Sequence, residues 1–281
     1  MNALVAQKFD EIYSLAAQSF VGTSFDQPYY TFQANAVAVL HFLEAIRTHS
    51  PATRFYQAST SEMYGGVVCP DEGYNEKSPF YPRSPYGVSK LAAFWLVKNY
   101  RESYGLKCCN GILFNHESPR RGHEFVTQKI CTWVKNISNT MWSNSCQGEF
   151  DLALENVGVL RLGNIDTSRD WGHAKDFVRG MWLILNQKED PLQDLVLGTG
   201  ETHTVREFIE IAVREGLRRE IVWTTGPHGL PYGVDKQTGL MMIECVREFY
   251  RPSEVDVLKA DARRAQEVLR WCPQISSDWS F

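Results

Sequence analysis

The 281-residue sequence contains no run of about 18 apolar residues, the length that a membrane-spanning helix needs. Its first residues also lack the basic start and apolar stretch that are typical of a signal peptide. The seven cysteines are scattered without a Cys-x-x-Cys pair, which disfavours a zinc site or a disulfide framework and predicts reduced thiols. We therefore expect a cytoplasmic protein without a membrane partner and without a metal.

An excess of basic residues is absent as well. Lys and Arg number 29 against 33 Asp and Glu, which gives a formal net charge of −4 at pH 7. This balance provides no general attraction for a nucleic-acid backbone, so we expect no nucleic-acid partner. Hydrophobic residues make up 43% of the chain and charged residues 22%, which is typical of a globular chain and not of a disordered one.

Predicted strands and helices alternate along the first 114 residues. Buried strands are predicted for three apolar segments: 10–17, 54–59 and 106–114. Between them, residues 28–48 carry apolar side chains at three- and four-residue steps, which is typical of a helix. Ser84-Pro85 begins a second predicted helix and Gly105 ends it. The order β-α-β-α-β is typical of a doubly wound parallel sheet and predicts the α/β class.

A glycine-rich phosphate-binding turn is missing. Dinucleotide-binding folds place such a turn after their first strand, where backbone N–H groups meet the pyrophosphate at a helix N-terminus. No G-x-G-x-x-G or G-x-x-G-x-x-G motif occurs in this chain. We therefore expect a partial Rossmann-like sheet whose first half is missing, followed by a smaller C-terminal substrate domain. Residues 136–158, rich in Asn and Ser, are predicted to form a loop.

The most specific chemical pattern is Tyr86-Gly-Val-Ser-Lys90, in the first turns of the helix that Ser84 begins. Residues four apart share a helix face, so the ammonium favours the deprotonated phenol. A free tyrosine, with a pKa near ~10, needs such a neighbour to act as a base near neutrality. A lone Y-x-x-x-K match more often marks a plain helix face. Thr60 and Glu62 directly follow a predicted strand, and this context favours catalysis.

Seven longer segments carry a second signal. They are FYQASTSEMYG (55–65), PFYPRSPYGVSK (79–90), NYRESYG (99–105), NGILFNHESPRRG (110–122), FVTQKI (125–130), SRDWGHAKDFV (168–178) and YRPSEVD (250–256). These segments resemble the GDP-mannose 4,6-dehydratase family of the extended short-chain dehydrogenase/reductases. The resemblance runs from about residue 9 to about residue 273 and implies a member truncated at its N-terminus.

The resemblance implies a lyase that converts GDP-mannose to GDP-4-keto-6-deoxymannose with NADP, a step of GDP-fucose biosynthesis. Lys90 would bind the nicotinamide ribose and lower the pKa of Tyr86, which would remove the proton of the sugar 4-hydroxyl while hydride leaves C4. Glu62 would take the C5 proton, and Thr60 with Glu62 would help the 6-hydroxyl leave as water. Hydride return to C6 leaves no net redox change.

Binding residues follow from the same resemblance. Cofactor contacts are implied for Leu15, Ala16, Ala17, Gln18, Ser19, Tyr30, Lys90, His116 and Arg121. GDP-sugar contacts are implied for Asn115, Lys129, Arg169, Arg251 and Glu254. Residues 1–116 and about 168–198 would form the remnant of the NADP-binding domain. Residues 117–167 and 199–281 would form an interleaved GDP-sugar-binding region.

Two other functions stay open. The chain could be a catalytically impaired relative that binds a nucleotide sugar or an intact subunit. It could also be another nucleotide-sugar epimerase or reductase, because epimerases share the Tyr and Lys but do not need the glutamate. Family members commonly pair through helices like 28–48 and 85–104, so the resemblance implies a homo-oligomer, a dimer or a tetramer.

Overall fold

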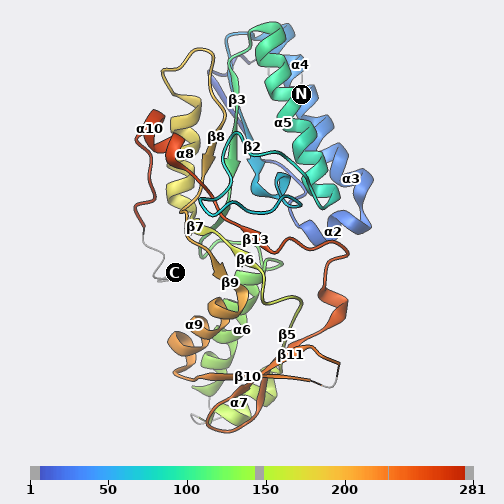
Figure 1. Ribbon diagram of the computed structural model, residues 1–281, viewed down its shortest axis with the longest axis vertical. Coiled ribbons are helices and arrows are strands. Elements are labelled where there is room, and N and C mark those ends of the chain that lie inside the picture. The colour runs from blue at the N-terminus through green and yellow to red at the C-terminus, as the bar shows by residue number, and fades with distance from the viewer. Residues whose placement is uncertain (1–6, 143–148, 227, 276–281) are drawn as a thin grey trace. The chain divides into compact units, whose positions relative to one another are not determined.

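The computed structural model describes residues 7–142, 149–226 and 228–275 (Figure 1). The chain divides into two compact units, which we describe separately. The first contains the described residues of Met1–Ser118, Arg169–Thr202 and Val257–Ser280. The second contains those of Pro119–Ser168 and His203–Asp256. Within the described ranges, no helix has both the length and the apolar character needed to cross a membrane.

A four-stranded parallel sheet forms the centre of the first unit. Its order is β1 (Glu11–Ser14), β2 (Arg54–Thr60), β3 (Cys108–Leu113) and β8 (Leu195–Leu197). This confirms the α/β class and the parallel arrangement of the three predicted strands. Strand β8 was not predicted, because three apolar residues are too few to give a periodic signal.

Helices cover both faces of this sheet (Figure 1). One face carries α4 (Ala38–His49) and α5 (Pro85–Tyr104), and the other carries α8 (Ala174–Leu185) and α10 (Arg263–Leu269). Adjacent residues of a strand point to opposite faces, so Cys108 is buried under α4 and α5 while Cys109 is buried under α8. The sheet is therefore buried on both sides, as parallel sheets require.

Helix α5 begins and ends where the sequence predicts. The hydroxyl of Ser84 accepts a hydrogen bond from the Gly87 N–H (3.0 Å), and Pro85 is the first helical residue. Gly105 ends the helix in the left-handed conformation at φ 65°. Both ends of this 20-residue helix are thus fixed by local sequence.

The predicted helix 28–48 is divided in the structure. It consists of α3 (Pro28–Phe32), a π-helical segment η1 (Gln33–Val37) and α4, and α2 (Val21–Asp26) precedes it. A π-helical turn widens the backbone and changes which residues face the sheet. The apolar periodicity of the sequence gave no sign of this turn.

The second unit combines helices with a small mixed sheet. Its helices are α6 (Val126–Met141), α7 (Phe150–Val157) and α9 (Val205–Leu217). Its sheet has the order β10 (Ile221–Thr225), β11 (Pro231–Asp235), β12 (Met241–Cys245) and β5 (Leu160–Leu162).

Short elements complete the chain: η2 (Ser61–Met63), β4 (Asn115–Glu117), β6 (Ser168–Arg169), β7 (Trp171–His173), β9 (His203–Thr204), η3 (Arg247–Phe249) and β13 (Val257–Leu258).

The predicted loop at 136–158 is wrong for most of its length. Helix α6 continues to Met141 and α7 begins at Phe150, while 143–148 lie outside the described residues. Ile137, Phe150 and Leu154 are buried, so packing of apolar faces overrides the weak helix preference of the Asn and Ser residues.

The compact units also differ from the predicted division. Residues 257–275, which the resemblance groups with the GDP-sugar-binding region 199–281, pack in the first unit, and the part they have in binding stays a prediction. Ala265 and Trp271 lie in the core under α8, and the Trp271 indole donates to the carbonyl of Asp176 (2.9 Å). Burial of these apolar side chains explains the difference.

Candidate active site

The predicted catalytic residues gather at the carboxyl end of β2, the edge at which open parallel sheets form their sites. Thr60 is the last residue of β2, and Glu62 follows in η2. The Thr60 hydroxyl accepts a hydrogen bond from the Glu62 N–H (3.2 Å). This contact caps η2 and holds the half-buried Glu62 directly beyond the strand.

The first turn of α5 lies against this segment. A Cβ atom at position 87 would lie 2.9 Å from the carbonyl oxygen of Glu62, so only glycine permits such an approach. Gly87 directly follows Tyr86. The backbone of Glu62 and the start of the helix that carries Tyr86 and Lys90 are therefore neighbours.

Tyr86 and Lys90 are buried together. The Nζ atom of Lys90 lies 6.0 Å from the centroid of the Tyr86 ring and donates to the Ala58 carbonyl (2.9 Å). Burial lowers the pKa of Lys90 from 10.5 to about 8. The predicted pairing of these two side chains is thus present. Their catalytic roles stay a prediction.

Asn35, which the sequence analysis missed, connects this helix to the segment after β1. Its side-chain amide donates to the Ser89 hydroxyl (3.0 Å) and to the Gln18 carbonyl (3.0 Å), and its Oδ1 accepts from the Gln18 N–H (2.8 Å). Ser89 in turn donates to the Tyr86 carbonyl (2.7 Å). Asn35 lies in η1, and a π-helical turn often marks a functional site. The only available signal was an asparagine inside an apolar helical pattern.

The segment 15–19, predicted to contact the cofactor, follows β1 at the same edge of the sheet. Gln18 fixes it in two further ways: its Nε2 donates to the Thr31 hydroxyl (3.0 Å), and its Oε1 accepts from the Phe20 N–H (2.7 Å). Leu15 and the predicted contact Tyr30 are exposed. Tyr30 directly precedes Thr31, the residue that Gln18 contacts.

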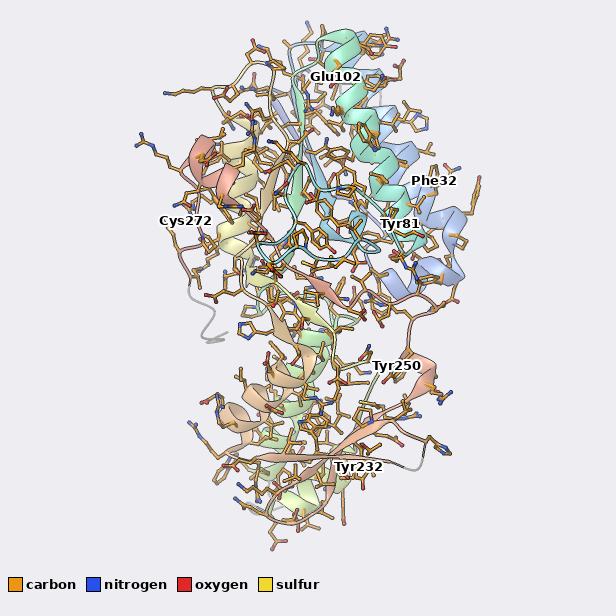
Figure 2. All side chains as sticks on the ribbon, viewed as in Figure 1. Phe32, Tyr81, Glu102, Tyr232, Tyr250 and Cys272 are labelled. Atoms are coloured by element: carbon orange, nitrogen blue, oxygen red, sulfur yellow. The ribbon has the colours of Figure 1, made fainter. Side chains whose placement is uncertain are left out.

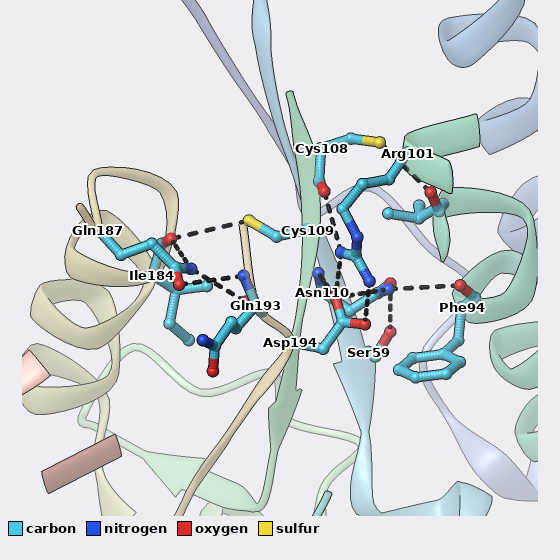
Figure 3. Close-up of polar contacts among 11 residues, drawn as sticks. Ser59, Phe94, Arg101, Cys108, Cys109, Asn110, Ile184, Gln187, Gln193 and Asp194 are labelled. Atoms are coloured by element: carbon cyan, nitrogen blue, oxygen red, sulfur yellow. Dashed lines mark hydrogen bonds and ion pairs between the residues drawn. The ribbon is translucent and has the colours of Figure 1, made fainter. Parts of the chain in front are cut away.

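A polar network supports β2 behind Thr60 (Figure 3). The Ser59 hydroxyl donates to Asn110 Oδ1 (3.2 Å), and the Asn110 N–H donates to Asp194 (2.7 Å). Asp194 also receives two hydrogen bonds from Arg101 of α5, at 2.8 and 2.7 Å. The Asn110 amide donates to the Phe94 carbonyl (3.3 Å), one helical turn after Lys90. Strands β2 and β3 are thereby fixed against the catalytic helix.

Three further predicted residues lie in the first unit, on short strands. His116 of β4 stacks on Phe177 (ring centroids 4.5 Å apart), and its Nδ1 lies 2.8 Å from the Phe114 carbonyl oxygen. Asn115 precedes it on the same strand, and Arg169 of β6 is buried. Their binding roles stay predictions.

The remaining predicted residues lie in the second unit. Lys129 donates to the Arg161 carbonyl (2.7 Å), its Nζ lies 4.6 Å from the centroid of the Phe249 ring, and burial lowers its pKa. An ion pair joins Arg251 Nη1 to Glu254 Oε1 (3.7 Å). Arg121 lies over the ring of Phe125, 3.5 Å from its centroid. Across the described ranges, no three His, Cys, Asp or Glu side chains are grouped to hold a metal ion.

A family model described as "GDP-mannose 4,6 dehydratase" matches residues 1–279. The chain belongs to the GDP-mannose 4,6-dehydratase family. A GDP-mannose 4,6 dehydratase of Drosophila melanogaster is 47% identical over 268 residues, which cover 95% of this chain and 62% of that protein. The human enzyme of the same name is 45% identical over 95% of this chain and 67% of its own length. The chain thus spans about two thirds of these two curated relatives.

Solved structures agree on the fold. A structure of RMD from Pseudomonas aeruginosa complexed with NADPH has a TM-score of 0.75 at 21% identity, covering 98% of this chain and 79% of that one. DesIV, a dTDP-glucose 4,6-dehydratase from Streptomyces venezuelae, has a TM-score of 0.74 at 22% identity, covering 99% and 73%. At these identities the likeness establishes the Rossmann-like fold alone.

Proposed function

We propose that this chain carries the catalytic residues of a GDP-mannose 4,6-dehydratase, a lyase that forms GDP-4-keto-6-deoxymannose. One observation supports this most strongly: in a member of this family, Tyr86 and Lys90 are buried together on a helix that contacts the backbone of Glu62. A base, its activating cation and a second carboxylate at one strand end are the groups that oxidation followed by elimination needs.

The described residues fit the nicotinamide end of a dinucleotide. An ammonium has three N–H donors, and one donor of Lys90 is bound by the Ala58 carbonyl, so others remain for ribose hydroxyls. When bound, the nicotinamide supplies transient storage of one hydride. We assign NADP because RMD, a structural neighbour, is complexed with NADPH, although DesIV holds NAD.

In the first step, Tyr86 removes the proton of the sugar 4-hydroxyl. The nearby ammonium of Lys90 stabilises the phenolate that this step requires, in a buried site where water screens the two charges little. The C4 hydrogen leaves as hydride, and C4 becomes a ketone. That ketone makes the hydrogen on C5 acidic, which prepares the elimination.

In the second step, Glu62 takes the C5 proton and the 6-hydroxyl leaves as water. The Thr60 oxygen already accepts the Glu62 N–H, so its O–H remains available to donate to the leaving oxygen. Hydride return to C6 and a proton to C5 complete the product.

GDP-sugar contacts are proposed for Asn115, Lys129, Arg169, Arg251 and Glu254. The cationic side chains of this set balance the charge of the pyrophosphate.

The test is incubation of the purified chain with GDP-mannose and NADP, followed by mass spectrometry. We expect a product lighter than GDP-mannose by one water. A product of unchanged mass with an altered sugar configuration would instead identify an epimerase. Calorimetric binding of GDP-mannose without any turnover would identify a binding relative, and both results would overturn the proposal.

We further propose that the chain forms a homo-oligomer through α3 and α5. Exposed aromatic side chains occur on both of these adjacent helices: Tyr29, Tyr30 and Phe32 on α3, and Trp95 and Tyr104 on α5 (Figure 2 labels Phe32). A second copy would cover this face. Trp95→Glu should yield monomers in light scattering, while Trp182→Glu, a similarly exposed tryptophan on α8, should not. A monomeric unsubstituted chain would refute this assembly.

A further inference from the structure

Two buried side chains share one backbone acceptor beneath the catalytic helix. The Ala58 carbonyl oxygen accepts the Lys90 ammonium and the Nε2 amide of Gln57, each at 2.9 Å. A carbonyl oxygen has two lone pairs, so both donors can be accommodated together. The two nitrogen atoms therefore lie within about 6 Å of each other, through one common oxygen.

The position of this carbonyl is set by the end of a neighbouring strand. The pairing of β1 with β2 ends at Ser14 and Gln57, so Ala58 is the first β2 residue beyond β1. Directly after Ser14, the chain leaves β1 and continues into segment 15–19. The Gln57 side chain thus lies where the predicted cofactor segment leaves the sheet.

Gln57 is itself an unusual buried group. Its side chain is 1% exposed, and among the described residues its Oε1 has no hydrogen-bond partner. A buried amide with an unmade hydrogen bond costs stability, so a plain packing role would be filled better by an apolar residue. The Nε2 of Gln57 donates to the Ala58 carbonyl oxygen, the atom that also accepts from Lys90.

We propose that Gln57 is a positioning residue for Lys90. The Gln57 amide holds the Ala58 carbonyl where the Lys90 ammonium binds it, and it adds no charge to the buried site. Its catalytic meaning rests on the proposed function, because only that function assigns Lys90 a role. The contact itself can be measured without turnover.

The surroundings of Lys90 are otherwise mostly uncharged. Tyr86 on the same helix is a titratable neighbour, with its ring centroid 6.0 Å from the Lys90 Nζ, and the backbone of Glu62 lies against the first turn of that helix. Gln57 on β2 shares the Ala58 carbonyl with Lys90. Along the same helix, Asn110 of β3 donates to the Phe94 carbonyl and Asn35 of η1 donates to Ser89. Burial alone lowers the pKa of Lys90, without a contribution from any described carboxylate. Gln57 is therefore the place where a charge change would act on Lys90 most directly.

The experiment measures the free energy of unfolding by urea between pH 7 and pH 10.5. The contribution of Lys90 is the difference in unfolding free energy between each variant and the same variant that also carries Lys90→Met. Gln57→Glu should pair with the ammonium and raise the pKa of Lys90, so the Lys90-dependent rise in stability with pH is lost. Gln57→Met removes the amide and lowers the polarity, so the rise should begin at lower pH. Substitutions of a merely structural residue are not expected to move the pKa of Lys90 in opposite directions.

Gln187→Glu is the matched control, since Gln187 is also a buried glutamine of the first unit. It lies after α8, and it should leave the Lys90-dependent rise unchanged. If Gln57→Glu and Gln187→Glu alter the rise equally, or if neither alters it, the inference is wrong. If GDP-mannose is not dehydrated, the proposed function fails, while the unfolding series still decides the role of Gln57.

Discussion

The side-chain amide of Asn35 donates to the hydroxyl of Ser89, 3.0 Å away and 54 positions later in the chain. Both side chains are buried, and both belong to one network that also binds the backbone of Gln18 and Tyr86. A single asparagine in a π-helical turn thus connects the predicted cofactor segment to the predicted catalytic helix. Asn35 therefore helps to hold these two predicted parts of the site in place.

Asn35→Leu should destabilise the first unit by about 1–3 kcal/mol, because it removes the partners of the half-buried Gln18 N–H and C=O and of the buried Ser89 hydroxyl. The measurement is urea unfolding. Asn99→Leu is the control, since Asn99 lies exposed on α5 and bonds Ser103, and it should change stability by less than about 0.5 kcal/mol. Equal effects would mean that the Asn35 network contributes no specific stabilisation.

Arg101→Met should destabilise the protein by about 3–5 kcal/mol, because the Asp194 carboxylate loses its partner while it stays largely buried. The two side chains are only 9% and 12% exposed. Arg47→Met removes an ion pair with Glu44, in which the two side chains are 42% and 43% exposed, and should destabilise the protein far less than Arg101→Met because water screens the two charges. Chemical denaturation gives the unfolding free energy of both variants. An Arg101→Met variant that loses no more stability than Arg47→Met would contradict the importance of this network.

Gly111→Ala should destabilise the sheet, because its Cβ would lie only 2.0 Å from the buried hydroxyl of Tyr56 on the neighbouring strand. We expect a loss of about 1–3 kcal/mol, typical of overpacking. Tyr56→Phe removes this hydroxyl, which has no hydrogen-bond partner among the described residues. The double variant should recover only part of the loss in thermal unfolding, because two ring carbons of residue 56 would still lie 2.7 and 2.9 Å from the added Cβ. Strictly additive losses would show that the hydroxyl does not contribute to the collision.

The stability of the protein should rise with pH between about 8 and 10.5 through Lys90. The folded pKa of Lys90 is about 8 and its ordinary value is 10.5, so within this window the unfolded state binds more protons than the folded state. Linkage then requires the unfolding free energy to increase as pH rises. Lys90→Met should remove this increase in urea titrations across the window. An unchanged pH dependence would show that Lys90 keeps its ordinary pKa.

Sequence reasoning predicted the parts of the fold that local chemistry determines. The cap at Ser84, the end at Gly105 and the presence of the three predicted strands depend on nearby residues, and the structure confirms them. Strand β1 (Glu11–Ser14) is shorter than the predicted 10–17. Strand β8, helix α7 and the π-helical turn depend on contacts far along the chain. Polar composition at 136–158 therefore misled the prediction, since burial of Ile137 and Leu154 decides the structure there.

The candidate site was predictable to a similar extent. A recognisable pattern contains Tyr86 and Lys90, and their four-residue spacing alone places them on one helix face. Asn35, Gln57 and Ser89 have no such pattern, because their partners are backbone groups and side chains of distant segments. Contacts of that kind become visible only once the sheet is assembled.

The most direct measurement of the central claim is the dehydration of GDP-mannose in deuterated water, followed by NMR of the sugar. If Glu62 takes the C5 proton and exchanges it with solvent, the 4-keto-6-deoxy product should carry deuterium at C5. Glu62→Gln should bind GDP-mannose in calorimetry yet form no product, and Tyr86→Phe should also be inactive. Product without deuterium at C5, or unchanged turnover by Glu62→Gln, would contradict the roles assigned to these residues.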